Sequence, residues 1–177
     1  MELTRDDQKI LARETRWQEQ VTARLPELLT ELLESPVYGL TEGRERPPEK
    51  YGAYLFTERG RPRYVGRVGL TERSRRAGKR FSSFRTRLAG HVRPRHGEGT
   101  YAYARTCELF RRRGLPLAGT RAGNCADRAF MEEFTRQCDR VRAMGFQVVE
   151  IKDNRLAAVF EIYAATVLGL RQSFAVS

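Results

Sequence analysis

The chain has 177 residues, a length that suits one domain able to bury its own hydrophobic core. It contains no run of eighteen apolar residues, and its N-terminal residues lack the apolar segment of a signal peptide, so we expect a cytoplasmic protein without a membrane span. The formal net charge of +11 favours acidic partners.

The positive charge is concentrated in residues 59–95, which contain thirteen Lys or Arg and a single acid, Glu72. This segment therefore carries a net charge of +12, and the other 140 residues sum to −1. Codon bias explains why Arg outnumbers Lys by 29 to 4, but it does not explain why the charge is segregated. Arg suits phosphate because its guanidinium donates paired hydrogen bonds. The segment also lacks the apolar stripe of a membrane-binding helix, so the expected partner is nucleic acid and not a membrane.

Residues 1–50 are predicted to form an N-terminal helical arm and a linker. Apolar residues from Ile10 to Leu32 recur at helical spacing, and Pro26 is expected to interrupt the pattern and start a second helix. Prolines among charged residues over 35–50 predict a connecting loop. We expect the arm to contribute packing rather than chemistry, and residues 51–177 to form the functional domain.

Two short runs rich in β-forming residues, 51–57 and 63–68, flank a charged, glycine-containing turn and predict a β-hairpin. Side chains alternate between the two faces of a strand, so the register decides whether Tyr54 and Tyr64 lie on the same side. If they do, the missing side chain at Gly66 leaves open space for a phosphate-sized ligand beside two phenols. Aromatic residues and glycine are also common in strands without a functional role, so the hairpin alone does not indicate a site.

The segment after the hairpin predicts a loop and then a helix. Residues 70–80 are polar and basic, and they lack the glycine spacing of a phosphate-binding P-loop. Ser82 or Ser83 is expected to cap a helix that runs to about residue 92. Arg87 and His91 are four residues apart on this helix and therefore share one of its faces.

The remaining elements complete an α+β pattern of three strands and several helices. We expect a helix or strand over 101–113, a glycine-rich loop to Asn124, an amphipathic helix capped by Asn124 with Asp127 and ended by Gly145, a third strand over 146–151, and a last helix from Asp153 or Asn154 through Leu168. Cys107, Cys125 and Cys138 lack the spacing of a zinc site and read as reduced thiols.

The last helix carries one interior charge, Glu161, among apolar residues that appear on every side of the helix, so we expect the helix to be largely buried. A buried carboxylate needs a cation, a proton or access to water. The residues three and four positions away on either side are alanines, which would leave a recess for a hydrated metal ion: Ala157, Ala158, Ala164 and Ala165. A structural ion pair with an arginine is a nearly equal alternative.

Four short motifs occur in order: Gly52-Ala53-Tyr54, Tyr64-Val65-Gly66, Arg87 followed four residues later by His91, and Glu161 in the last helix. In this order they resemble the GIY-YIG nuclease superfamily over roughly residues 51–174. Residues 168–174 are similar to the closing motif of that family, with Gln172 or Ser173 in the region where the family has asparagine. The segment between the second and third motifs is longer than in minimal members, so Arg85 or Arg67 could take the place of the catalytic arginine.

The resemblance implies a small three-stranded antiparallel sheet flanked by helices, and the activity of a metal-dependent endonuclease that hydrolyses DNA phosphodiester bonds. It implies that Glu161 binds Mg²⁺ or Mn²⁺ and that Arg87 neutralises charge on the phosphate. Tyr54 or Tyr64 would orient or deprotonate the attacking water, assisted by His91, provided that nearby cations lower the pKa of the phenol. No small-molecule cofactor is expected. The basic residues expected to contact DNA are Arg67, Arg73, Arg75, Arg76, Lys79, Arg80 and Arg85.

Two other functions are compatible with these residues. One is a nucleic-acid-binding domain on the same scaffold with weak or no catalysis. The other is a basic interaction protein whose helical arm recruits a partner. Because the chain supplies one set of site residues, a monomer that nicks duplex DNA is favoured, with the arm around Trp17 as the alternative dimer interface. Sequence specificity and biological role, whether restriction, repair or mobile-element transfer, stay open.

Overall fold

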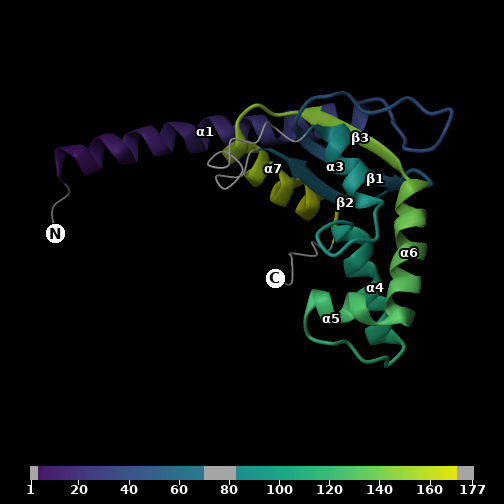
Figure 1. Cartoon of the computed structure of the whole chain (residues 1–177). Coiled ribbons are helices and arrows are strands. Elements are labelled where there is room, and N and C mark those ends of the chain that lie inside the picture. The colour runs from purple at the N-terminus through teal and green to yellow at the C-terminus, as the bar shows by residue number, and fades with distance from the viewer. Residues whose placement is uncertain (1–3, 70–82, 171–177) are drawn as a thin grey trace.

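The computed structural model describes residues 4–69 and 83–170 (Figure 1). These residues form six helices and three strands, which confirms the α+β class, the antiparallel sheet and the N-terminal helix. In chain order the elements are α1 (Arg5–Glu34), β1 (Gly52–Glu58), β2 (Arg61–Val68), α3 (Phe84–His91), α4 (Thr100–Arg112), α5 (Arg121–Ala126), α6 (Arg128–Arg142), β3 (Gly145–Glu150) and α7 (Asn154–Val167).

The predicted hairpin is confirmed, and its turn is tighter than expected. Strands β1 and β2 continue to Glu58 and Arg61, so only Arg59 and Gly60 connect them. Both residues have positive φ, 53° and 73°, which matches the type I′ turn that favours the natural twist of a two-residue hairpin. The sheet has the order β2-β1-β3 with antiparallel neighbours, so β1 is the central strand and β2 is an edge strand.

A β-bulge in β2 decides which side chains share a face of the sheet. Phe56 pairs with Tyr64, but the next residue of β1, Thr57, pairs with Pro62, so Arg63 is the extra residue on β2. The register also places Tyr54 directly opposite Gly66. Tyr54 and Tyr64 therefore lie on the same face, with ring centroids 6.2 Å apart.

The sheet separates two hydrophobic clusters. Tyr54, Phe56 and Phe146 belong to the cluster that packs against α3, α4 and α6. The alternate residues of the same strands, among them Leu55 and Val65, belong to the cluster that packs against α1 and α7. Figure 1 shows the same division, with α1 and α7 on one side of the sheet and α4 to α6 on the other. Each face of the sheet is thus covered by helices.

The expectation that Pro26 starts a second helix is wrong, because α1 is continuous through this residue. Proline removes one backbone donor and usually kinks a helix. Here the leucines on both sides of it, Leu25, Leu28, Leu29 and Leu32, are all buried in the second cluster. Their packing holds the C-terminal half of α1 against the sheet, whereas the N-terminal half projects away from it (Figure 1).

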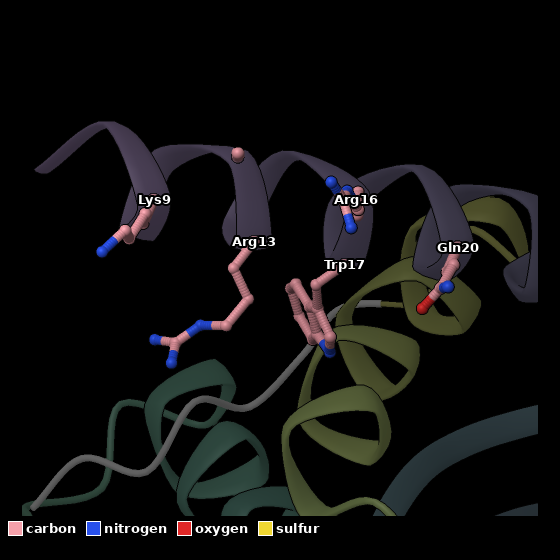
Figure 2. A pocket seen from close by; sticks show the side chains of 6 residues that line it. Lys9, Arg13, Arg16, Trp17 and Gln20 are labelled. Carbon is pink, nitrogen blue, oxygen red and sulfur yellow. The ribbon is translucent and has the colours of Figure 1, made fainter. Parts of the chain in front are cut away.

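A contact near the middle of α1 joins this helix to α7. The guanidinium of Arg155 lies 3.6 Å from the ring centroid of Trp17 and also pairs with Glu14. Figure 2 shows Trp17 reaching from α1 toward α7, beside a surface hollow of about 420 Å³. All six residues that line the hollow come from α1: Lys9, Ala12, Arg13, Arg16, Trp17 and Gln20. The predicted packing role of the arm is therefore observed from Trp17 onward.

Most of the predicted caps are present. The hydroxyl of Ser83 accepts from the backbone N–H of Thr86 at the start of α3, and the carboxylate of Asp153 accepts from the backbone N–H groups at the start of α7. The α6 cap is Asp127 alone. Asn124 instead lies in the short helix α5, within the segment expected to be a loop, where its side chain binds the backbone of Ala118.

The last helix is less buried than its composition predicts. Phe160, Ala164 and Ala165 are buried, but Ile162 and Val167 are 52% and 55% exposed. One helical face meets the sheet and α1, and the other face meets solvent, so the apolar residues around α7 do not all pack. Among the residues described, every helix is too short or too polar to cross a bilayer.

Candidate active site

The register of the hairpin builds the site around Tyr54. This residue is on the central strand and has no exposed surface. Its ring covers Gly66, and a Cβ atom built at Gly66 would lie 2.5 Å from Tyr54 Cζ. The expected open space for a phosphate beside Gly66 is therefore absent, because the phenol of Tyr54 fills it. The glycine permits close packing of the first tyrosine and does not form a ligand cavity.

Helix α3 brings His91 to the hydroxyl of Tyr54. Tyr54 Oη and His91 Nε2 share a hydrogen bond of 2.6 Å, and His91 is only 2% exposed. The imidazole ring stands edge-on to the rings of Phe56 and Tyr64. The side chains of Phe84 and Leu88 are buried on the same helix and fix its orientation on the sheet. The expected proximity of His91 to the tyrosines is therefore observed.

Burial keeps His91 neutral. Desolvation, with a smaller contribution from the charge of Arg87, lowers the pKa of His91 from 6.5 to about 3. Its Nδ1 atom is buried and has no hydrogen-bond partner among the described residues. A neutral imidazole beneath the surface cannot exchange protons freely with solvent, so its direct effect is to hold the hydroxyl of Tyr54.

Both phenols are more basic than tyrosine in water. Desolvation raises the pKa of Tyr54 well above 10, and the neighbouring Tyr64 raises it further. Desolvation, followed by the charge of Glu161, also raises the pKa of Tyr64. Arg87 opposes the rise at both tyrosines and forms a hydrogen bond with Tyr54. The condition under which a tyrosine could act as a base, a phenol pKa lowered by nearby cations, is not met in this structure, so both hydroxyls carry their protons at neutral pH.

The two tyrosines differ in their access to solvent. Tyr64 is partly exposed on the edge strand, whereas Tyr54 is enclosed. Sequence reasoning missed Tyr101, whose ring lies against Tyr64 with centroids 5.1 Å apart. Tyr101 comes from the start of α4, thirty-seven residues after Tyr64, and no local motif predicts this contact. Of the two tyrosines, Tyr64 is therefore the one with solvent-exposed surface.

Glu161 lies beside these groups and is paired. Its Oε2 accepts from Nε of Arg67 on β2 at 3.0 Å, with side chains that are 27% and 42% exposed. Desolvation raises the pKa of Glu161, and the charges of Arg67 and Arg87 act against that rise. The alternative of an arginine-paired glutamate is therefore observed in this state.

Three of the four alanines expected to form a recess around Glu161 are packed in the core. Ala157, Ala164 and Ala165 are each no more than 1% exposed, in the cluster between α7 and the sheet. Small side chains let α7 approach β1 and β2 closely, which is how the carboxylate reaches the edge strand. The side chain of Glu161 is itself partly exposed.

The carboxylate of Glu161 suits a hard divalent cation whose other ligands are water molecules and substrate phosphate. Magnesium is often held by one or two carboxylates together with waters and substrate phosphates. Within residues 4–69 and 83–170 no group of three His, Cys, Asp or Glu side chains could hold a metal. The Glu161 carboxylate offers the kind of oxygen donor that such an ion takes alongside phosphate and water.

The residues expected to contact DNA are only partly described. Arg67 pairs with Glu161, and Arg85 points to Glu49 at 2.9 Å on the exposed side of α3. Arg87, two residues further along α3, is the arginine that contacts Tyr54, so it and not Arg85 occupies the place beside the tyrosines. The other expected DNA contacts and the closing motif lie outside the described residues: Arg73, Arg75, Arg76, Lys79, Arg80, Gln172 and Ser173.

No family model, curated protein or solved structure matches this chain.

Proposed function

We propose that the protein is a metal-dependent endonuclease that hydrolyses DNA phosphodiester bonds, in line with the resemblance of its motifs to GIY-YIG nucleases. The observation that carries the proposal is the convergence of Tyr54, Tyr64, Arg87, His91 and Glu161 from four separate elements. Phenols, a guanidinium and a carboxylate close enough to shift one another's pKa are rare in a hydrophobic core but suit phosphoryl chemistry.

Hydrolysis of a phosphodiester needs an aligned water, neutralisation of the phosphoryl oxygens and help for the leaving oxygen. A divalent ion at Glu161, when bound, supplies Lewis acidity to the phosphate and its leaving oxygen. Arg87 stabilises negative charge on the phosphate from the side of α3. Its fixed contact with Tyr54 keeps the guanidinium oriented before substrate arrives.

The two tyrosines have different roles in the proposed mechanism, because one is partly exposed and the other is enclosed. Tyr64, which is partly exposed, orients the attacking water through its hydroxyl. Tyr54, which is enclosed, is a positioning residue: it links His91 on one side to Arg87 on the other. Because the pKa of each phenol is raised, Tyr64 becomes a base only when additional positive charge comes close to it.

The experiment that tests the function is incubation of the purified full chain with supercoiled plasmid, single-stranded DNA and branched DNA, each with Mg²⁺, Mn²⁺ or EDTA. We expect cleavage that EDTA abolishes, and nicked circles before linear DNA if the protein acts as a monomer. Cleavage of none of these substrates by folded protein at any metal concentration would contradict the proposal.

The second candidate is a DNA-binding domain on the same scaffold without catalysis. It is favoured by the ion pair of Glu161 with Arg67, because a structural carboxylate needs no metal. It predicts salt-dependent binding to DNA with no metal-dependent cleavage. The plasmid assay separates the two candidates when binding is measured in the same samples.

A further inference from the structure

Arg67 lies on the edge strand β2, where its side chain contacts Glu161 and is also open to solvent. It pairs with Ala53 in the register of the sheet and therefore faces α7, on the opposite side from Tyr64 and Gly66. Because β2 has a neighbour on one side only, the Arg67 side chain is 42% exposed while its Nε holds Glu161. The same guanidinium is thus bound to the carboxylate and accessible from solution.

The charges around Glu161 oppose a metal ion in the free protein. Two cationic side chains, Arg67 from β2 and Arg87 from α3, act on this one carboxylate. No cluster of further acids or histidines compensates them in the part of the chain that the structure describes. A cationic site of this kind attracts a phosphate more readily than a free divalent cation.

From this geometry we propose that Arg67 is a positioning residue that takes the place of the divalent cation at Glu161 until DNA arrives, and that it then moves to the DNA phosphate. The inference rests on the proposed function and adds to it the order in which DNA and the metal ion bind. In the free protein Arg67 neutralises the carboxylate. When a phosphodiester is present, the guanidinium of Arg67 donates paired hydrogen bonds to the phosphate oxygens. The carboxylate of Glu161 is then free to bind the metal ion together with the phosphate.

Exchange of this kind is feasible because the ion pair is partly exposed. Pairs in contact with water are weak, since solvent screens both charges. A fully buried pair could not be opened without leaving an unpaired charge behind. The exchange also makes DNA binding and cation binding cooperative, and thermodynamic linkage requires each to strengthen the other by the same factor.

The test is the binding of MnCl₂, followed by the electron paramagnetic resonance signal of free Mn²⁺, to the full-length parent and to Arg67→Gln without DNA. We expect Arg67→Gln to bind Mn²⁺ roughly tenfold more tightly than the parent, within the usual range of coupling between sites. The matched control is Arg63→Gln. Arg63 is on the same strand, its side chain is also 42% exposed, and it pairs with Glu58. The control removes the same charge and should leave Mn²⁺ binding unchanged.

A second measurement adds a short duplex that carries phosphorothioate linkages to slow cleavage. The duplex should tighten Mn²⁺ binding by the parent and by Arg63→Gln more than it tightens binding by Arg67→Gln, after subtraction of the signal that Glu161→Gln gives with the same duplex. If Arg67→Gln does not fold, Arg67→Met keeps the apolar stem and is compared with Arg63→Met in the same way.

The outcomes distinguish the proposed role of Arg67 from the proposed nuclease function. Equal Mn²⁺ affinity of the parent and Arg67→Gln, with the site lost in Glu161→Gln, would overturn the role of Arg67 and leave the proposed nuclease intact. With the duplex present, equal Mn²⁺ binding by the parent and Glu161→Gln would remove Glu161 as the ligand and with it the role of Arg67, whereas the proposed nuclease is contradicted separately, by absence of cleavage in the plasmid assay.

Discussion

Gly66 lies directly opposite Tyr54 in the β1–β2 register, and the phenol of Tyr54 covers the space that a side chain at Gly66 would need. The last residue of the motif Gly52-Ala53-Tyr54 therefore packs on the last residue of the motif Tyr64-Val65-Gly66. This contact gives the glycine a packing role that can be measured separately from activity.

Gly66→Ala should destabilise the fold, because the added Cβ would lie against the ring of Tyr54 at the centre of the sheet. Overpacking of a core in this way costs about 1–3 kcal/mol. Urea unfolding followed by circular dichroism measures the change. Gly97→Ala is the control, since a Cβ there meets nothing within 4 Å. Equal stability of Gly66→Ala and the parent would show that the sheet adapts without cost.

The buried histidine predicts a loss of stability in acid. His91 has a pKa lowered to about 3 in the fold, so below pH 6.5 the unfolded chain binds a proton that the folded chain does not. Its contribution is fully present above pH 6.5 and is lost as the pH falls toward 3, which amounts to a few kcal/mol. Unfolding free energies of the parent and His91→Gln between pH 7 and pH 3 should converge. His96→Gln, which replaces the exposed histidine, is the control. Parallel curves for the parent and His91→Gln would contradict the prediction.

Glu161→Gln should abolish metal-dependent cleavage and leave the fold intact, because the exchange is nearly isosteric and removes the charge that would hold the ion. We expect a loss of about a hundredfold or more in rate. Plasmid cleavage across a Mg²⁺ titration measures it, with thermal unfolding as the check on folding. Glu150→Gln is a matched control, since Glu150 is a partly exposed carboxylate paired with Lys50. Equal rates for Glu161→Gln and the parent would remove Glu161 from the site.

Arg87→Ala should reduce turnover far more than DNA affinity, by about 10²- to 10³-fold, because this guanidinium lies beside the tyrosines and, in the proposed mechanism, faces the developing charge. Arg85→Ala, two residues away on α3 and paired with Glu49, should change the rate little. Charge reversal at Arg73, Arg75 and Arg76 should weaken binding and flatten its salt dependence. Single-turnover rates at saturating protein separate the two effects. Weaker binding with an unchanged saturated rate would assign Arg87 to the DNA-binding surface.

The two tyrosines should respond differently to loss of the hydroxyl. Tyr54→Phe leaves Nε2 of His91 buried without its partner, which costs about 1–3 kcal/mol of stability. Tyr64→Phe changes a residue that is only partly buried, and it should lower the cleavage rate with a smaller loss of stability. Paired measurements of melting temperature and cleavage rate on both variants distinguish the roles. A destabilised Tyr64→Phe that cleaves at the parental rate would reverse the assignment.

The sequence by itself determined the elements that depend on local chemistry. Runs of β-forming residues predicted the two hairpin strands, and an alternating pattern predicted the third. The candidate caps for three helix starts were Ser82 or Ser83, Asn124 with Asp127, and Asp153 or Asn154. The structure uses Ser83, Asp127 and Asp153, and such starts are predictable because a cap bonds to backbone groups only two or three residues away. It also placed Arg87 and His91 on one helical face, since that spacing is a property of the helix itself. Pro26 misled the prediction because its local cost is outweighed by buried leucines on both sides.

Only the tertiary structure decided how these elements meet. The bulge at Arg63 and the register of the hairpin put Tyr54 over Gly66 and Tyr64 on the same face, and neither follows from strand propensity. The ion pair between Arg67 and Glu161 spans 94 residues, so no local pattern can reveal it. Burial raised the pKa of both tyrosines despite the nearby arginines, because desolvation of a phenolate outweighs the attraction of a charge that solvent partly screens.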